Sequence, residues 1–240
     1  MLNQIDLFRF LQIYVIQGFL LAIFLYLAYK ILRYKKKRLN RVFSRFYISS
    51  SIGVLINFIY APLQIQGFET VVLILNFLTN FFIVYSLTFF LIFLLILLRS
   101  EKFLTVRKEL IIEIVYGIIF FSLIFFLPFG GVKIDASTNW KPVYSLPFYL
   151  YLTIILIIFM IIPILYVSFK IYNDFTDELL KKKWQYFLFG IISLIVFMFG
   201  TFTANFLNIE AFRSAWSIIA GILVLLGSYL VYYGVGKQIK

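Results

Sequence analysis

Neutral polar side chains recur at helical spacing within long apolar stretches of the sequence. Asn57, Tyr60 and Gln64 are spaced i, i+3, i+7, and Asn76 and Asn80 are spaced i, i+4, so each set shares one face of a helix. Amide and phenol groups donate and accept hydrogen bonds, either to a neighbouring helix or to a bound ligand. These faces are the first candidates for a functional site.

Two further stretches extend this polar set. Thr201, Asn205 and Asn208 are spaced i, i+4, i+7, and Tyr14 and Gln17 lie in the first apolar stretch. An amide without a partner in hydrocarbon is costly, so these faces must meet inside a bundle. There they either bond helices together or line a cavity for a small-molecule ligand, and the sequence leaves both readings open.

The residue types that are absent restrict the chemistry. The chain has no His and no Cys, which excludes Cys or His zinc sites, haem ligation by His, disulfides, cysteine nucleophiles and Ser-His-Asp triads. Glu113 is the only acid that lies well inside an apolar stretch, so no acid–base pair is evident. We therefore predict no catalytic residues, no metal site, no cofactor and no enzyme activity.

The composition indicates whether the folded chain is surrounded by water or by lipid. Its 240 residues are 63% hydrophobic and 13% charged, with a mean hydropathy of +1.02, whereas soluble domains average about 45–50% apolar and about 25% charged residues. Soluble enzymes and nucleic-acid-binding proteins are excluded. We predict a multi-pass protein of the cell membrane whose first partner is the lipid bilayer.

Seven stretches are long and apolar enough to cross a bilayer as helices. Their approximate bounds are 7–32, 46–66, 70–98, 109–128, 147–172, 184–207 and 212–234. The predicted fold is all-α: a polytopic membrane protein forming one seven-helix bundle, with residues 1–240 as a single domain.

The basic residues predict an orientation. The segments 30–45, 99–113, 170–183 and 237–240 hold 18 of the 22 Lys and Arg residues. By the positive-inside rule these segments are cytoplasmic, which places the N-terminus outside and the C-terminus inside. The run 35–38 would also suit anionic lipid or nucleic acid, but its role in topology explains it, and we expect no nucleic-acid partner.

The last apolar stretch carries two further signals. Arg213 could receive an anionic group, although we expect it to pair with its neighbour Glu210. Ala220, Gly227 and Gly234 repeat every seven residues, a pattern that allows close helix packing. We expect this seam to pack within the bundle rather than to form a dimer face.

Three local features are expected within the spans and beside them. The segment 129–146 predicts a short hairpin over the outer mouth, with Trp140 and Tyr144 in the interfacial aromatic belt. Pro163 should kink the fifth stretch. Acidic and then basic residues over 173–184 predict a helical extension leading into the sixth stretch.

Several short motifs resemble those of a known family. They are Asn139-Trp140-Lys141-Pro142-Val143-Tyr144 before the fifth stretch, Lys183-Trp184-Gln185 before the sixth, and Tyr232-Tyr233-Gly234 at the end of the seventh. With them, residues 140–236 resemble the second half of the N-terminal seven-helix sensor region of bacterial and archaeal membrane histidine kinases. The first half is similar in topology and in its basic first inner loop. Such sensors continue into signalling domains, and this chain ends six residues after the seventh stretch, so the resemblance implies a receptor module without the kinase.

Three functional hypotheses follow. The first is a sensory receptor that binds a small ligand from the outer side and signals through a separate cytoplasmic or membrane partner. The second is a small-molecule transporter component, disfavoured because no internal repeat is evident and only Pro163 interrupts a span. The third is a structural or accessory subunit of a membrane complex.

Overall fold

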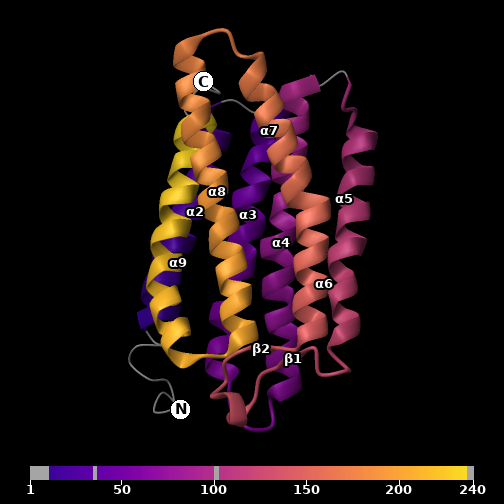
Figure 1. Ribbon diagram of the computed structural model, residues 1–240, viewed down its shortest axis with the longest axis vertical. Helices are drawn as coiled ribbons and strands as arrows, with labels where there is room; N and C mark the ends of the chain where they lie inside the picture. The colour runs from indigo at the N-terminus through magenta and orange to yellow at the C-terminus, as the bar shows by residue number, and fades with distance from the viewer. Residues whose placement is uncertain (1–10, 35–36, 100–102, 237–240) are drawn as a thin grey trace.

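The computed structural model describes residues 11–34, 37–99 and 103–236. In this part of the chain seven helical segments are long and apolar enough to cross a membrane, which confirms the predicted all-α, seven-span architecture. They lie side by side in one bundle (Figure 1). The seven segments are Ile13–Arg33, Arg38–Leu63, Glu69–Arg99, Val106–Phe126, Leu146–Asp174, Glu178–Leu207 and Glu210–Val235. The predicted start of the first stretch, residues 7–10, lies outside the described residues.

Regular elements account for nearly all of these spans. The helices are α2 (Gln17–Tyr34), α3 (Arg38–Tyr60), α4 (Glu69–Arg99), α5 (Val106–Phe121), α6 (Leu146–Leu156), α7 (Ile162–Asp174), α8 (Glu178–Leu207) and α9 (Glu210–Val231). Shorter π and 3₁₀ segments are η2 (Leu11–Ile16), η3 (Ala61–Leu63), η4 (Ser122–Phe126), η5 (Ala136–Thr138), η6 (Ile157–Ile161) and η7 (Tyr232–Gly236). The strands are β1 (Val132–Lys133) and β2 (Val143–Tyr144).

Two helices begin earlier than the apolar pattern predicts. α3 starts at Arg38 rather than near residue 46, and α8 starts at Glu178 rather than at 184. Charged residues end a hydrophobic stretch, but Arg, Lys and Glu are good helix formers and continue the helix into the polar zone. The Asp177 carboxylate caps α8 by accepting hydrogen bonds from the backbone N–H groups of Leu179 (2.7 Å) and Leu180 (3.2 Å). Of the extension predicted over 173–184, residues 178–184 are thus part of α8, whereas residues 173–174 end α7.

The helices form a ring with one member outside it. α2 packs on α3, α3 on α4, and α8 on α9, while contacts of α9 with α2, of α7 with α4, and of α6 and α7 with α8 close the ring. α5 lies at the edge of the bundle and packs mainly against α4 (Figure 1). It is the least buried of the seven spans, as expected for a helix that faces lipid on most sides.

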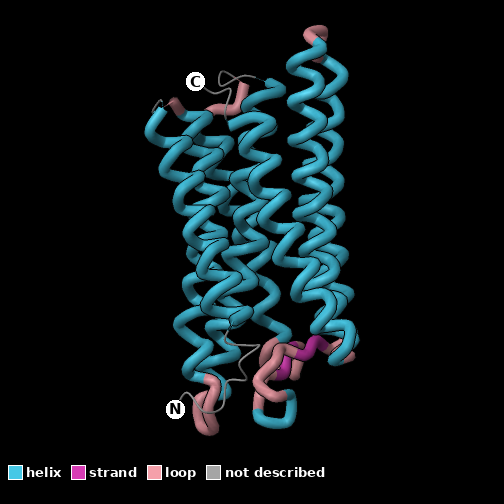
Figure 2. Tube along the Cα trace, turned by 90° about the vertical axis from the view of Figure 1, so that its left-hand side faces the viewer, coloured by secondary structure: helices cyan, strands magenta, loops and turns pink. Residues whose placement is uncertain are grey.

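A short antiparallel hairpin confirms the prediction for the segment 129–146. β1 and β2 pair in the register Val132 with Tyr144 and Lys133 with Val143. The strands and their loops gather at one end of the bundle, which we call the hairpin end (Figure 2). The Ser145 hydroxyl accepts a hydrogen bond from the backbone N–H of Phe148 (3.4 Å) and so starts α6 directly after β2.

The proline expected to interrupt the fifth span does so through a π segment. Pro163 is near the start of α7, directly after η6. Since proline has no backbone N–H and its ring crowds the preceding turn, the regular hydrogen-bond ladder cannot pass this point. The wider π turn of η6 accommodates the break, and the span continues to Asp174.

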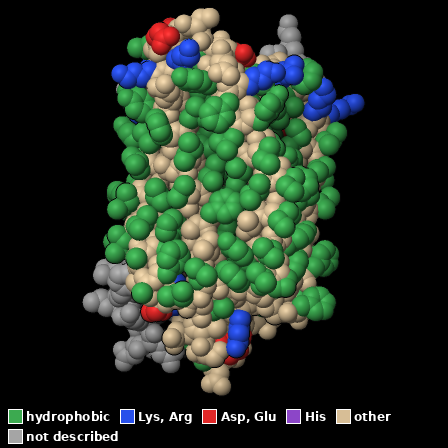
Figure 3. Space-filling model, in the orientation of Figure 1, with side chains coloured by type: hydrophobic (Ala, Val, Ile, Leu, Met, Phe, Trp, Pro, Cys, Tyr) green, Lys and Arg blue, Asp and Glu red, His purple; other side chains and the backbone are tan. Residues whose placement is uncertain are grey.

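Charge divides the bundle into two unlike ends. Figure 3 shows a broad hydrophobic band with Lys and Arg side chains gathered near one end and few at the other. Among the described residues, all Lys and Arg except Lys133, Lys141 and Arg213 lie where α2 meets α3, α4 meets α5 and α7 meets α8, mostly in the ends of these helices, and we call this the basic end. α7 and α8 project beyond the other helices there (Figure 2).

Candidate functional site

A cavity of about 690 Å³ opens among the helices at the hairpin end. Its walls come from η2, α2, α3, α4, α8 and α9, and residues 139–144 of the hairpin segment lie over it. Its volume falls within the range of about 300–1,000 Å³ that is typical of small-molecule sites. The bundle therefore contains a ligand-sized space that the sequence alone did not reveal.

The predicted polar residues converge on this cavity. Nine of the eleven line it: Gln17, Asn57, Tyr60, Gln64, Asn76, Asn80, Thr201, Asn205 and Arg213. These nine side chains come from α2, α3, α4, α8, α9 and the turn after η3. The helical spacing read from the sequence thus identified the inward faces correctly.

Two predicted residues lie outside the lining. Tyr14 packs its ring against Phe58, with the ring centroids 5.8 Å apart. Asn208 is exposed and forms the C-terminal cap of α8 with φ = 52°. The helical alignment assumed for Asn208 is wrong because α8 ends at Leu207, and Asn adopts this left-handed cap conformation more readily than most residues.

The polar lining residues also bond the helices to one another. The Asn57 amide donates to the Gln17 carbonyl oxygen, joining α3 to α2. The Asn76 amide donates to the Tyr60 hydroxyl at 3.1 Å, and Asn80 donates to the Asn76 side-chain oxygen at 3.2 Å. The two interpretations of these polar faces are therefore compatible, since the same amide side chains connect helices and face a cavity.

Tyr144 connects the hairpin to this hydrogen-bond chain. Its hydroxyl donates to the side-chain oxygen of Asn80 at 3.4 Å, and its ring is buried. Burial raises the pKa of the Tyr144 phenol to about 12. Tyr144 was expected in the interfacial aromatic belt, but its ring is buried in the bundle, because its place opposite Val132 in the hairpin turns it toward Asn80 of α4 and Phe202 of α8.

The charges at the mouth pair differently from the sequence prediction. Glu210 contacts the Lys141 ammonium at 2.6 Å rather than Arg213. Arg213 instead donates to backbone carbonyl oxygens, those of Pro142 (2.6 Å), Ala204 (3.1 Å) and Asn205 (3.4 Å). Arg213 therefore ties the start of α9 to the end of α8 and to the hairpin segment.

Several lining residues were not in the predicted set. The polar ones are Ser50, Thr79, Ser86, Asn139, Lys141, Tyr144, Glu210, Ser214, Trp216 and Ser217. A sequence signal existed for two of them, since Trp216 and Ser217 follow Arg213 at i+3 and i+4 and share its face of the helix. For Tyr144 the alternation along a two-residue strand was too short to read.

Trp216 forms part of the cavity wall because a glycine leaves room for it. Its indole N–H donates to the Thr201 hydroxyl at 3.2 Å, and a Cβ atom on Gly200 would lie 1.9 Å from the indole ring. Any side chain at position 200 would displace the indole ring of Trp216. This glycine fixes the wall between α8 and α9.

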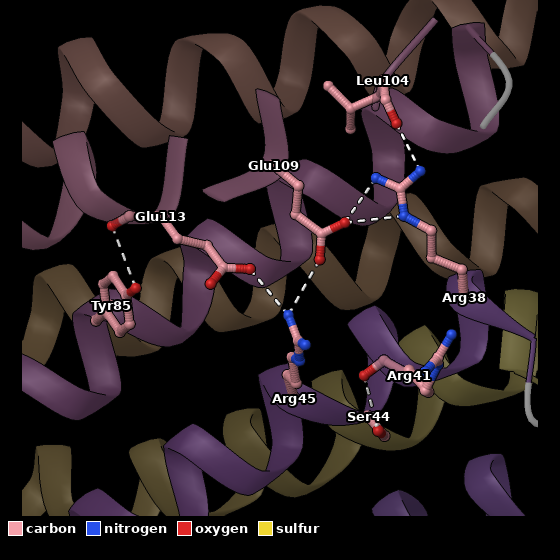
Figure 4. Close-up of polar contacts among 8 residues, drawn as sticks. All are labelled: Arg38, Arg41, Ser44, Arg45, Tyr85, Leu104, Glu109 and Glu113. Atoms are coloured by element: carbon pink, nitrogen blue, oxygen red, sulfur yellow. Dashed lines mark hydrogen bonds and ion pairs between the residues drawn. The ribbon is translucent and has the colours of Figure 1, made fainter. Parts of the chain in front are cut away.

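A second polar cluster lies at the basic end (Figure 4). Arg38 contacts Glu109 at 2.6 Å and donates to the Leu104 carbonyl oxygen at 2.6 Å. Arg45 contacts Glu109 at 3.0 Å and Glu113 at 2.9 Å. Glu113, which the sequence shows as an isolated acid, is thus part of a network of two Arg and two Glu residues that ties α5 to α3.

Comparison of the chain with protein-family models, with curated proteins and with solved structures finds no match.

Proposed function

We propose that this protein is a receptor-like sensory module of the cell membrane that binds a small ligand in the cavity from the outer side. The observation that carries the proposal is the cavity itself, which has ligand-sized volume, a polar mouth and walls from five spans. Concave sites between helices are a usual location for ligands. In this proposal the hairpin end faces outward and the basic end faces the cytoplasm.

The arrangement of α8 and α9 supports a signalling role. Both helices line the cavity and both continue to the basic end, so a ligand between them contacts elements that reach the cytoplasmic side. A ligand shifts a conformational equilibrium only if it binds one arrangement more tightly than another. We propose that the signal passes to a separate cytoplasmic or membrane partner, as the resemblance to kinase sensor regions implies.

Ligand binding in the cavity is tested with a matched pair of variants. Ser217→Trp places a large ring in the cavity, whereas Ile218→Trp places the same ring one residue further, at a position that is 56% exposed outside it. A metabolite library is screened by thermal unfolding of the detergent-solubilised protein. A ligand at 100 times its Kd stabilises a protein by about 2.7 kcal/mol, which raises Tm by several degrees.

We expect a compound that raises the Tm of the unmodified chain and of Ile218→Trp but leaves that of Ser217→Trp unchanged. Equal shifts in both variants would place binding elsewhere. The absence of any stabilising compound in the screen would contradict the receptor proposal.

The proposed transfer of a signal to the basic end is tested separately. Because the chain has no cysteine, Arg107→Cys and Glu178→Cys provide two spin-label sites at the basic end without background labelling. We expect the stabilising compound to change the distance between the labels. An unchanged distance, with co-purification of the chain in a stoichiometric membrane assembly, would instead support an accessory subunit, which the interhelical bonds of Asn57 and Asn76 also suit.

A further inference from the structure

The lining of the cavity changes from polar to apolar along its length. On α9 the order from the hairpin end inward is Arg213, Ser217, Val224, and on α8 it is Asn205, Thr201, Leu194. The amide side chains of α3 and α4 also lie toward the hairpin end, and beyond them the polar lining residues of these two helices are the hydroxyls of Ser50 and Ser86. The deep half is lined mainly by large apolar side chains: Phe24, Phe46, Leu87, Leu194, Met198 and Val224.

The floor is apolar beyond the main cavity as well. A second void of about 20 Å³ lies among apolar side chains and shares Phe46, Leu87, Leu194 and Met198 with the main cavity. Cavities lined by such residues stay dry and accept apolar groups. A fully water-soluble ligand would leave this part of the cavity without a partner.

Among the described residues that line the mouth, the positive charges exceed the negative ones by one, since they are Lys141, Arg213 and Glu210. Lys141 and Glu210 compensate each other at 2.6 Å. Arg213 interacts with Glu210 only over a longer distance, and its contacts are with neutral carbonyl oxygens. Within the described part of the chain none of these hydrogen bonds uses Nη1, so this nitrogen remains available to an acceptor in the cavity.

Arg213 is also held in place before a ligand arrives. Its three carbonyl contacts, on Pro142 directly before β2 and on Ala204 and Asn205 of α8, fix the guanidinium at the edge of the cavity. A guanidinium suits carboxylate and phosphate oxygens, and a preorganised one loses less entropy on binding. The position is therefore suited to an anionic group.

We propose that the cavity binds a single-chain amphiphile with an anionic head group, the head at Arg213 and the chain directed toward Phe46 and Leu87. This inference depends on the proposed function, in which the cavity is a ligand site, and names the class of ligand. Val224 lies eleven residues beyond Arg213 on α9, about 16 Å at the rise of an α-helix. That length accommodates an alkyl chain of medium length, and the volume suits one chain rather than a two-chain lipid.

The experiment measures binding of tritiated dodecanoate to the protein in nanodiscs of phosphatidylcholine, with protein-free nanodiscs as the background. We expect saturable binding of dodecanoate and only weak competition by octanoate, since each methylene group removed from the chain should weaken binding about fourfold. Dodecyltrimethylammonium should not compete. Competition by dodecyl phosphate against dodecanoate distinguishes a phosphate head group from a carboxylate.

Two variants locate the ligand. Arg213→Gln should weaken dodecanoate binding at least tenfold, and Ala220→Phe, which fills the cavity below the mouth, should abolish the dependence on chain length. Ile218→Phe, outside the cavity, should bind as the unmodified chain does. Should Arg213→Gln fail to fold, the head-group series and Ala220→Phe still decide the question.

Equal competition by the cationic amphiphile, or unchanged binding by Ala220→Phe, would overturn the inference. If no amphiphile binds but a water-soluble compound stabilises the protein in a manner sensitive to Ser217→Trp, the proposed function stands and this ligand class is wrong. If neither kind of compound binds, both proposals fail.

Discussion

Gly190 on α8 and Gly227 on α9 face each other so closely that neither position has room for a side chain. A Cβ atom on Gly190 would lie 2.7 Å from the carbonyl oxygen of Gly227, and one on Gly227 would lie 3.0 Å from the carbonyl oxygen of Gly190. Gly234, further along the same seam, approaches Lys183 and Phe187 of α8 in the same way. Gly227 and Gly234 of the predicted repeat thus pack against α8 within the bundle, whereas Ala220, its first member, lines the cavity.

Gly190→Ala should therefore destabilise the protein by roughly 1–3 kcal/mol, because the added methyl group pushes two backbones apart. The measurement is Tm in detergent. Gly117→Ala is the control, since a Cβ there meets only Tyr85 at an ordinary 3.6 Å. A Tm for Gly190→Ala equal to that of Gly117→Ala would contradict the close contact.

Glu109→Gln should destabilise the bundle toward the lower end of roughly 3–5 kcal/mol, the cost of removing one partner of a buried ion pair. The change leaves Arg38, which is largely buried, without its carboxylate, and removes one of the two acids that Arg45 contacts. Denaturant unfolding measures the loss. Glu178→Gln is the control. The Glu178 side chain is 89% exposed and lies as far as 4.0 Å from Lys181, so its loss should change stability very little.

The proposed orientation predicts which end reacts with a membrane-impermeant maleimide in intact cells. Ala136→Cys lies exposed at the hairpin end, and Arg107→Cys lies exposed at the basic end. We expect labelling of Ala136→Cys in intact cells and of Arg107→Cys only after permeabilisation. The reverse pattern would place the basic end outside, against the positive-inside rule.

Tyr144 predicts a loss of stability at alkaline pH. Burial raises the pKa of its phenol to about 12, above the ordinary value of 10.0, so the folded state holds this proton more tightly than the unfolded state does. The stabilising contribution is complete below pH 10 and is lost as pH rises through 12. Nearby groups also act on the Tyr144 pKa. Asn205, Asn80 and Arg213 lower this pKa, and Tyr60 raises it further.

The measurement for Tyr144 is the free energy of unfolding between pH 9 and 12. Tyr144→Phe should show a shallower decline over this interval than the unmodified chain. Parallel curves for the unmodified chain and Tyr144→Phe would contradict the buried, neutral phenol.

The helix starts show how far the sequence predicts the fold. The number and order of the spans follow from hydropathy, because about 20 apolar residues are needed to cross hydrocarbon wherever they occur in a chain. The starts of α3 and α8 do not follow from it, because Arg38 and Lys181 lie within helices that continue past the apolar band. Hydropathy reports the solvent of a residue and not its backbone conformation.

The cavity shows the same division for the candidate site. The spacing of Asn57, Asn76 and Asn205 placed them on inward faces, because a helix repeats every 3.6 residues and polar groups avoid lipid. Periodicity gives the angle of a side chain around its own helix, but neither its neighbour nor whether space remains between them. Whether Glu210 would meet Arg213 or Lys141 depended on how the hairpin folds over the mouth.

The sequence by itself determined the membrane as solvent, seven spans, the faces that turn inward and the excess of charge at one end, since these depend on local composition and period. Only the tertiary structure decided that five spans enclose about 690 Å³, that amide side chains of neighbouring helices bond to one another, and that Arg213 lies at the polar mouth of a cavity whose floor is apolar. These features arise from the volume left when side chains of distant segments pack against one another. No single segment of the sequence encodes that volume.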